Sequence, residues 1–342
     1  MPDDKPFSIT GAVTALAALG YPRPFVKKIL PSWWDQSAAG TSAGALEYAL
    51  MLRDRLGLRS SFSPTGVLRI ETDVPGARFK KRMTTHLASL ATSARLGSAV
   101  ARMALRAAPP GVALPADPDA IHRAVAALAR GAPVTLEWLT RYCWRCGIPV
   151  VQLQLLPSKA TKMAGMVIRH QGRYAIVLAH AYRENARQAF IVAHELGHIA
   201  LGHLTEDGAL VDEAVEAVEE TLRRQDTDAE EQAADAFALN VLRGNTIIPE
   251  VASLGVTPAT LAARSLLASR DSAIDPAHIV LSYAHNSRDW KTATQAMRFL
   301  PGAIDAPSVL HRVFQEEAEA TTLSQDDRDY LAQMQGTGPA TP

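Results

Sequence analysis

Residues 185–203 read NARQAFIVAHELGHIALGH, and this stretch decides how the rest of the chain is interpreted. Its apolar residues recur every three or four positions until Gly202, so it predicts one helix from about Asn185 to Gly202. His194 and His198 lie four residues apart, which places both imidazoles on one face of this helix. Glu195 follows the first histidine and lies on the same side.

This spacing predicts a metal site. Two imidazole nitrogens on one helical face can hold one zinc ion at about 2.0–2.1 Å each, and a nearby carboxylate can take a proton from an activated water. The H-E-x-x-H pattern therefore predicts His194 and His198 as zinc ligands and Glu195 as the general base of a peptide-bond hydrolase. The alternative is two surface histidines on an ordinary helix, which is disfavoured because the pattern directly follows predicted strands.

A catalytic zinc site needs a third protein ligand, with water in the fourth position. Residues 228–242, DAEEQAADAFALNVL, form another helical pattern in which Glu231 and Asp235 share a face. This arrangement favours Glu231 as the ligand, with Asp235 accepting the far N–H of a ligand histidine. The rival ligands are Glu230 and four glutamates of the acidic run 205–228, which otherwise reads as a solvated loop or helix: Glu213, Glu216, Glu219 and Glu220.

Several other residues near these segments could assist the chemistry or could be structural. The candidates for stabilising the oxyanion of a tetrahedral intermediate are Tyr182, Arg187, His278 and His285. His203 lies about 140° round the helix from His198, so we interpret it as a helix-end histidine rather than a ligand. Cys143 and Cys146 form a lone C-x-x-C without the second pair that a zinc ribbon requires, and the plain interpretation is two reduced thiols.

Strand patterns precede the active-site helix. Residues 148–156, 164–169 and 174–179 read as strands, and the last two are joined at His170–Arg173 by a hairpin with a glycine at its turn. The predicted fold class is therefore α+β: a helical N-terminal region, a zincin-like metallopeptidase domain with a small sheet packed on the active-site helix, and C-terminal helices.

The N-terminal region predicts short helices. The spacing of Leu16, Gly20, Val26 and Ile29 fits a helix–turn–helix, with Lys27 and Lys28 on the exposed helix, but a generic three-helix bundle needs the same spacing. Residues 76–106 read as a basic helical stretch that could bind phosphates or a membrane surface, or could be an ordinary solvated face.

Charge is unevenly distributed along the chain. Residues 1–150 hold 19 Lys and Arg against 10 Asp and Glu, whereas residues 151–342 hold 16 against 25. This asymmetry fits either a DNA-facing N-terminal half or two surfaces that attract one another.

The composition breaks suggest five segments. These are a helical, helix–turn–helix-like domain (1–60), a basic helical connector with a Pro-rich linker (61–118), the metallopeptidase domain (119–245), a C-terminal helical region of no assigned function (246–310) and a polar, partly disordered tail (311–342). We expect no signal peptide and no membrane span, because Asp3 and Asp4 stand at the start and arginines interrupt the most apolar run. A cytoplasmic location follows.

Four segments together resemble the ImmA/IrrE family of metallopeptidases. They are residues 147–151, 176–178, 187–198 and 231–238, and the resemblance covers about residues 135–245. It implies a compact domain with zinc ligands at His194, His198 and Glu231 and the base at Glu195. Asp235 stands where many members have asparagine, and either side chain can accept a hydrogen bond from imidazole.

The resemblance also implies a function. It indicates an intracellular zinc endopeptidase that cleaves a helix–turn–helix repressor and so relieves repression in a stress response or a mobile element. Because family members often carry a DNA-binding helix–turn–helix, DNA is a second expected partner. The alternatives are a DNA-binding regulator, or a toxin–antitoxin or phage-defence component, in which the metal site is regulatory.

Overall fold

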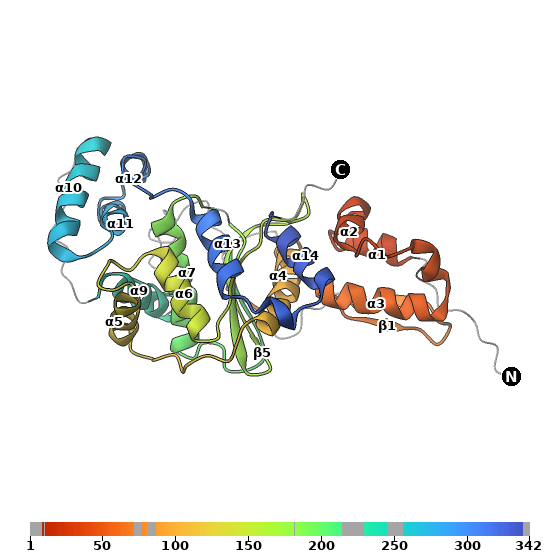
Figure 1. The fold of residues 1–342 in the computed structure, drawn as a ribbon. Coiled ribbons are helices and arrows are strands. Elements are labelled where there is room, and N and C mark those ends of the chain that lie inside the picture. Colours follow the sequence, from red (N-terminus) through yellow and green to blue (C-terminus); the bar gives the residue numbers. More distant parts are fainter. Residues whose placement is uncertain are drawn as a thin grey trace.

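A five-stranded mixed sheet forms the middle of the molecule (Figure 1). The computed structural model describes residues 9, 11–71, 77–80, 87–180, 182–213, 229–244 and 256–337. The strand order is β3 (Ala77–Lys80), β7 (Gly208–Glu213), β5 (Met163–His170), β6 (Arg173–Leu178) and β4 (Val150–Gln152). Strand β5 runs antiparallel to both of its neighbours, while β3 is parallel to β7 and β4 is parallel to β6. The predicted α+β class and the hairpin between β5 and β6 are confirmed.

Helices cover both faces of this sheet. Alternate residues of a strand point to opposite faces, and on β5 Met166 and Ile168 pack in the cluster around α4 (Leu87–Ala107). Val167 lies between them and packs in a second cluster with α7 (Asn185–Ala200), the helix that carries His194 and His198. The sheet is therefore buried on both sides, which explains why its strands contain long apolar runs rather than a polar face.

The segment expected to be a basic helical connector instead belongs to this central layer. Residues 77–80 form the edge strand β3, and α4 packs on the sheet as a buried helix. Its basic side chains are engaged within the molecule, since Arg95 is 5% exposed, Arg102 donates to the carbonyl of Arg53, and Arg106 pairs with Asp327. The structure thus places residues 77–80 and α4, which the prediction assigned to a connector over 61–118, in the central layer, because small apolar residues let one face of α4 approach the strands.

The N-terminal unit consists of α1 (Ala12–Ala18), α2 (Arg23–Ile29), the 3-10 helix η1 (Gln36–Gly40), α3 (Ser42–Leu56) and a hairpin of β1 (Ser60–Phe62) with β2 (Leu68–Ile70). Gly20 lies in the α1–α2 turn with φ +90°, a left-handed conformation that favours glycine. The side chains of Lys27 and Lys28 are exposed, in line with the predicted arrangement. Binding of DNA by this unit stays a prediction.

The C-terminal segment is folded where we expected a polar tail. Helix α13 (Ala306–Glu317) packs against α6 (Leu136–Arg145), the short 3-10 helix η2 (Ala320–Thr322) follows, and α14 (Gln325–Met334) packs against α4. Tyr330 is 1% exposed, and its hydroxyl donates to the carbonyl of Arg55. We predicted a partly disordered tail over 311–342, and this prediction is wrong for the described residues up to 337. A few well-spaced apolar residues anchor a helix whose average composition is polar.

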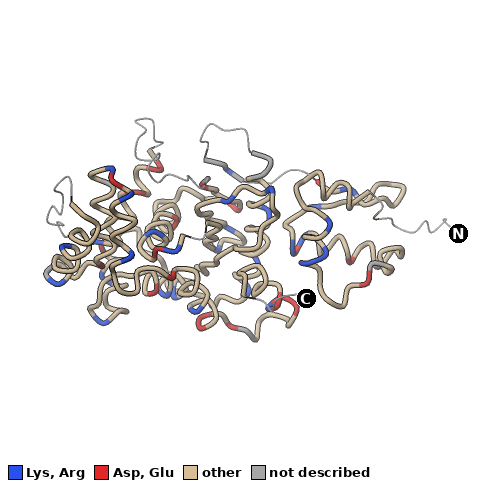
Figure 2. Tube along the Cα trace, turned by 90° about the horizontal axis from the view of Figure 1, so that it is seen from above, with Lys and Arg blue, Asp and Glu red and all other residues tan. Residues whose placement is uncertain are grey.

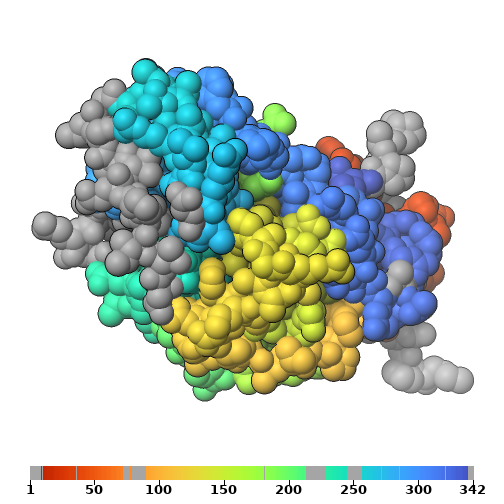
Figure 3. All heavy atoms as spheres, turned by 60° about the vertical axis from the view of Figure 1, so that its left-hand side comes forward, coloured from red at the N-terminus to blue at the C-terminus, as the bar shows by residue number. Residues whose placement is uncertain are grey.

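The remaining helices complete the other end of the molecule. Helix α5 (Pro118–Leu128) packs on α9 (Ala229–Arg243), and α10 (Pro258–Ser272), α11 (Pro276–Ser287) and α12 (Trp290–Met297) form a separate apolar cluster. In Figure 3 these C-terminal helices (cyan to blue) lie beside α5 and α6 (gold to yellow). Within the described ranges, no helix combines the length and apolar character needed to cross a membrane.

Charges of the two chain halves meet inside the structure. Arg141 of α6 forms ion pairs with Glu316 and Glu317 of α13, and Arg312 pairs with Glu137. Lys and Arg are spread along the whole molecule among Asp and Glu (Figure 2). Some of the unevenly distributed charges therefore form ion pairs between the two halves of the chain.

Candidate metal centre

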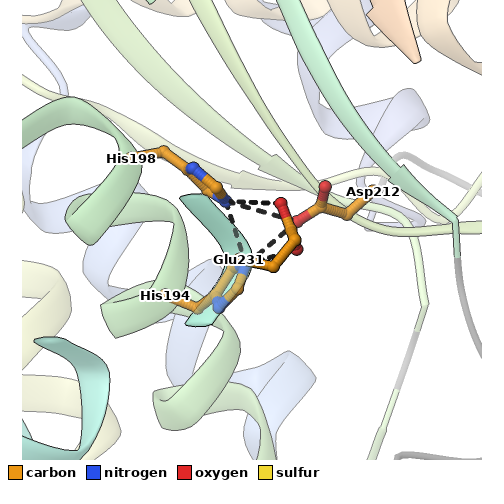
Figure 4. A group of neighbouring side chains, drawn as sticks. All are labelled: His194, His198, Asp212 and Glu231. Carbon is orange, nitrogen blue, oxygen red and sulfur yellow. Dashed lines mark hydrogen bonds and ion pairs between the residues drawn. The ribbon is translucent and has the colours of Figure 1, made fainter. Parts of the chain in front are cut away.

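Three elements bring the candidate residues together at one point (Figure 4). Helix α7 carries His194, Glu195 and His198, which are 9%, 1% and 0% exposed. Helix α9 contributes Glu231, and strand β7 contributes Asp212. Leu210 of β7 packs with the α7 cluster, so Asp212, two residues further along the strand, points to the same face.

The ligand atoms of four side chains converge. The Nε2 atoms of His194 and His198 are 3.0 Å apart. His194 Nε2 lies 3.5 Å from Oε2 of Glu231, and His198 Nε2 lies 3.5 Å from Oε1 of the same carboxylate. The Oδ2 atom of Asp212 lies 3.2 Å from His194 Nε2 and 3.9 Å from His198 Nε2. All four donors lie within 4.8 Å of one another, so the four side chains form a candidate site for a single ion.

The outer nitrogens of both imidazoles are held by other side chains. His194 Nδ1 lies 2.8 Å from Asp235 Oδ1, and His198 Nδ1 lies 2.7 Å from His203 Nδ1. If each Nδ1 carries the proton in its bond, the Nε2 lone pairs of the two histidines face each other. Two lone pairs at 3.0 Å repel unless a proton or a cation lies between them, so the residues present fit a bound metal ion.

Two glycines make this geometry sterically possible. A Cβ atom on Gly197 would lie 3.2 Å from a ring carbon of Phe237 and 3.3 Å from the backbone of Ala234, so glycine here lets α9 approach α7 closely. A Cβ atom on Gly165 of β5 would lie only 1.9 Å from Oε1 of Glu195. The carboxylate of Glu195 therefore occupies the space that a side chain at position 165 would need.

Burial and crowding of carboxylates shift the pKa values of this cluster. Burial and the neighbouring Asp212 raise the pKa of Glu195 well above its usual value. Burial disfavours the charged form of His194, but hydrogen bonds with Asp212, Asp235 and Glu231 outweigh it and raise the pKa of His194. Burial and the charge of His194 lower the pKa of His198 to about 4. The directions of these shifts favour the charged form of His194 and the neutral form of His198 in the metal-free protein.

Comparison with known proteins agrees with this site. Residues 146–268 match the family model described as the IrrE N-terminal-like domain of peptidase family M78. The chain carries an ImmA/IrrE-type peptidase domain. No curated protein matches the chain. The match supports a metallopeptidase-type function, and the matched range holds every residue of the cluster.

The residues that the sequence nominated as oxyanion stabilisers lie outside the cluster, and only Tyr182 and Arg187 fall within the matched range 146–268. The guanidinium of Arg187 is 4.9 Å from the ring of Tyr182 and 5.6 Å from that of Trp290. Arg187 lies two helical turns before His194, about 10 Å along the axis. His285 belongs to α11, and its side chain lies outside the described part of the chain. His278 is 3% exposed in the same helix, and the burial lowers its pKa.

Sequence reasoning missed Asp212 in the peptidase domain and undervalued His203. The acidic run 205–228 read as a solvated loop or helix, whereas its first part is β7, in the interior of the sheet. The available signal was the apolar triplet Ala209–Val211, which is typical of a buried strand ending at an acid. The rivals Glu216, Glu219 and Glu220 lie outside the described residues; Glu213 ends β7, and Glu230 precedes Glu231 in α9. Cys143 and Cys146 are free thiols, and Cys143 is buried.

Proposed function

We propose that this protein is a zinc-dependent endopeptidase whose metal is held by His194, His198 and Glu231. The observation that carries the proposal is the pair of Nε2 atoms turned toward each other and toward carboxylate oxygens, while both Nδ1 atoms are held from behind. Two imidazoles and a glutamate form a donor set that zinc commonly takes in hydrolases. The ion would supply Lewis acidity, polarising a substrate carbonyl and lowering the pKa of a water molecule.

The side chains around the metal would handle the proton. Glu195 takes it from the attacking water and passes it to the leaving amine of the cleaved peptide. Its raised pKa suits this exchange, because a carboxylate with a pKa nearer neutrality can both accept and return a proton at physiological pH. Asp235 and His203 hold the two imidazoles in the tautomer that keeps Nε2 for the metal.

Two substitutions test the assignment on the full chain. Glu195→Gln should bind zinc like the parent and lose cleavage of a quenched fluorescent peptide library, because Glu195 is the base and not a ligand. His194→Ala should lose the zinc on elemental analysis, with His170→Ala as the matched control. Cleavage by Glu195→Gln at the parental rate, or full zinc retention by His194→Ala, would refute the mechanism.

The substrate that we propose is a helix–turn–helix repressor, as the family resemblance suggests, in the cytoplasm. The test is incubation of the parent and of Glu195→Gln with the repressor encoded next to this gene, followed by mass spectrometry of the products. A new cleavage product formed by the parent alone supports the proposal. An intact repressor after incubation with the zinc-loaded parent counts against it.

The alternative function is a DNA-binding regulator, or a toxin–antitoxin or phage-defence component, with a regulatory metal site. The exposed Lys27 and Lys28 on α2 are the observation that favours it. Because α4 is part of the central layer, the whole chain must be used in a gel shift at low salt. Binding lost in Lys27→Glu/Lys28→Glu would support this reading, and absence of any shift would reject it. Co-purification with a neighbouring gene product would identify the toxin–antitoxin or phage-defence case.

A further inference from the structure

Asp212 makes the cluster resemble a closed coordination shell. Four donors placed 2.0–2.1 Å from a tetrahedral zinc ion lie about 3.3–3.4 Å from one another. The separations between the donors of His194, His198, Glu231 and Asp212 run from 3.0 Å to 3.9 Å for the pairs that involve a histidine. Four protein donors around one zinc ion would fill its shell, whereas a catalytic zinc keeps one position for water.

We infer that Asp212 is a fourth, displaceable zinc ligand, which keeps the centre closed at rest and must withdraw before a substrate can be cleaved. The inference rests on the proposed zinc peptidase function and adds its regulation. In the arrangement described, the position that catalysis needs for water is filled by the Asp212 carboxylate. Glu195 then lies beside another carboxylate and has no water from which to take a proton.

Asp212 is held less firmly than the two histidine ligands. His194 is supported by Asp235, and His198 is supported by His203. By contrast, Oδ1 of Asp212 is buried and accepts no hydrogen bond from the residues that the structure describes. Its Oδ2 atom also makes the longest of the histidine–carboxylate pairs at the cluster, 3.9 Å to His198 Nε2. Because ligands without a supporting partner are bound less tightly, Asp212 is more readily displaced than either histidine.

The backbone of β7 keeps Asp212 within reach after it leaves. Asp212 pairs in register with Gly165 of β5 and with Lys80 of β3, so the strand is held on both sides. Only a rotation of the Asp212 side chain is needed to open the metal. Closure and opening therefore require no movement of α7 or α9, which carry the other three ligands.

Cobalt(II) in place of zinc tests this inference on the full chain. The probe is acetohydroxamate, which needs an open metal position, and its binding is followed by the visible spectrum of cobalt. We expect Asp212→Ala and Asp212→Asn to bind acetohydroxamate at least tenfold more tightly than the parent. We also expect them to hold zinc at least tenfold more weakly in a chelator competition, since a ligand has been removed. Asp207→Asn, an exposed aspartate outside the cluster, is the control.

The outcomes separate the two proposals. Acetohydroxamate affinity and zinc affinity in both Asp212 variants within twofold of the parent would overturn the inference and leave the proposed peptidase standing. A parent that holds no zinc would overturn the proposed function itself. Because Asp212→Asn nearly preserves the shape of the side chain, it keeps the test decisive if Asp212→Ala fails to fold, which thermal unfolding of the metal-free proteins would reveal.

Discussion

Replacing Gly165 by alanine should disable Glu195, the proposed general base, without touching a proposed metal ligand. The new Cβ atom would lie 1.9 Å from Oε1 of Glu195, 2.6 Å from its Cδ and 2.9 Å from its Cγ. An ordinary contact needs at least about 3.4 Å, so the carboxylate must retreat by about 1.5 Å. Glu195 is 1% exposed, so its side chain can move only against other packed groups.

The size of the effect follows from this displacement. A misplacement of about 1 Å can lower a rate roughly 100-fold, which corresponds to about 2.7 kcal/mol of transition-state free energy. Overpacking the interface between β5 and α7 should also lower the free energy of unfolding by about 1–3 kcal/mol. Zinc content should stay at the parental level, because neither Gly165 nor Glu195 is a ligand.

The assay compares kcat/KM on a quenched fluorescent peptide library with zinc content measured on the same preparation. Gly40→Ala is the matched control, because a Cβ atom there meets nothing within 4 Å. A Gly165→Ala enzyme that keeps its zinc and cleaves within threefold of the parent would refute the placement of Glu195 as the base. Loss of zinc in this variant would show that β5 positions ligands rather than the base.

Three further predictions address the support of the centre, its protonation and the C-terminal helices. Asp235→Ala should weaken zinc binding about 10- to 100-fold in a chelator competition, because His194 loses its partner. Asp235→Asn should bind zinc with nearly the affinity of the parent. Equal zinc affinity for the parent and both variants would contradict this role of Asp235. Because the pKa of His194 is raised in the folded protein, protonation of His194 stabilises the metal-free fold. This stabilisation is fully present below pH 6.5 and is lost as the pH rises through the higher pKa of the folded state. The stability measured by thermal unfolding should therefore fall above neutrality. His194→Gln should lose that part of the pH dependence, and an unchanged profile would be evidence against the raised pKa. Tyr330→Ala should lower the free energy of unfolding by about 3–5 kcal/mol, because a fully buried ring is removed. The adjacent control, Asp329→Ala, should change it by less than about 0.5 kcal/mol. Similar denaturant midpoints for both variants would argue against packing of α14.

The local parts of the site could be predicted from the sequence. The spacing of His194 and His198 depends only on helix geometry, and the structure places Glu231 and Asp235 beside them from a second regular helix. The β5–β6 hairpin was equally accessible, since its turn carries a glycine between two apolar runs. Periodicity within one element was sufficient in each case.

Features that depend on distant partners could not be predicted in this way. In the sequence, Asp212 is one of several neighbouring acidic residues. Only the pairing of its strand with β5 and β3 places it beside the histidines. The basic residues of α4 suggested a solvated surface, and only the folded sheet shows that the opposite side of that helix is buried. The polar average composition of α14 gave no sign that this helix packs on the rest of the molecule. Three buried residues are enough to anchor it against α4.

The pairing of β3 with β7 orders events during synthesis of the chain. Residues 77–80 leave the ribosome long before their partners at 209–212, so β3 must wait unpaired while the intervening strands and helices are made. Closing so large a loop is slow relative to formation of local hairpins such as β5–β6. A nascent chain that stops before residue 208 contains both histidines and the glutamate base but lacks β7 and α9. The candidate metal centre is therefore assembled from late-made segments, so the proposed peptidase activity cannot begin before the chain is nearly complete.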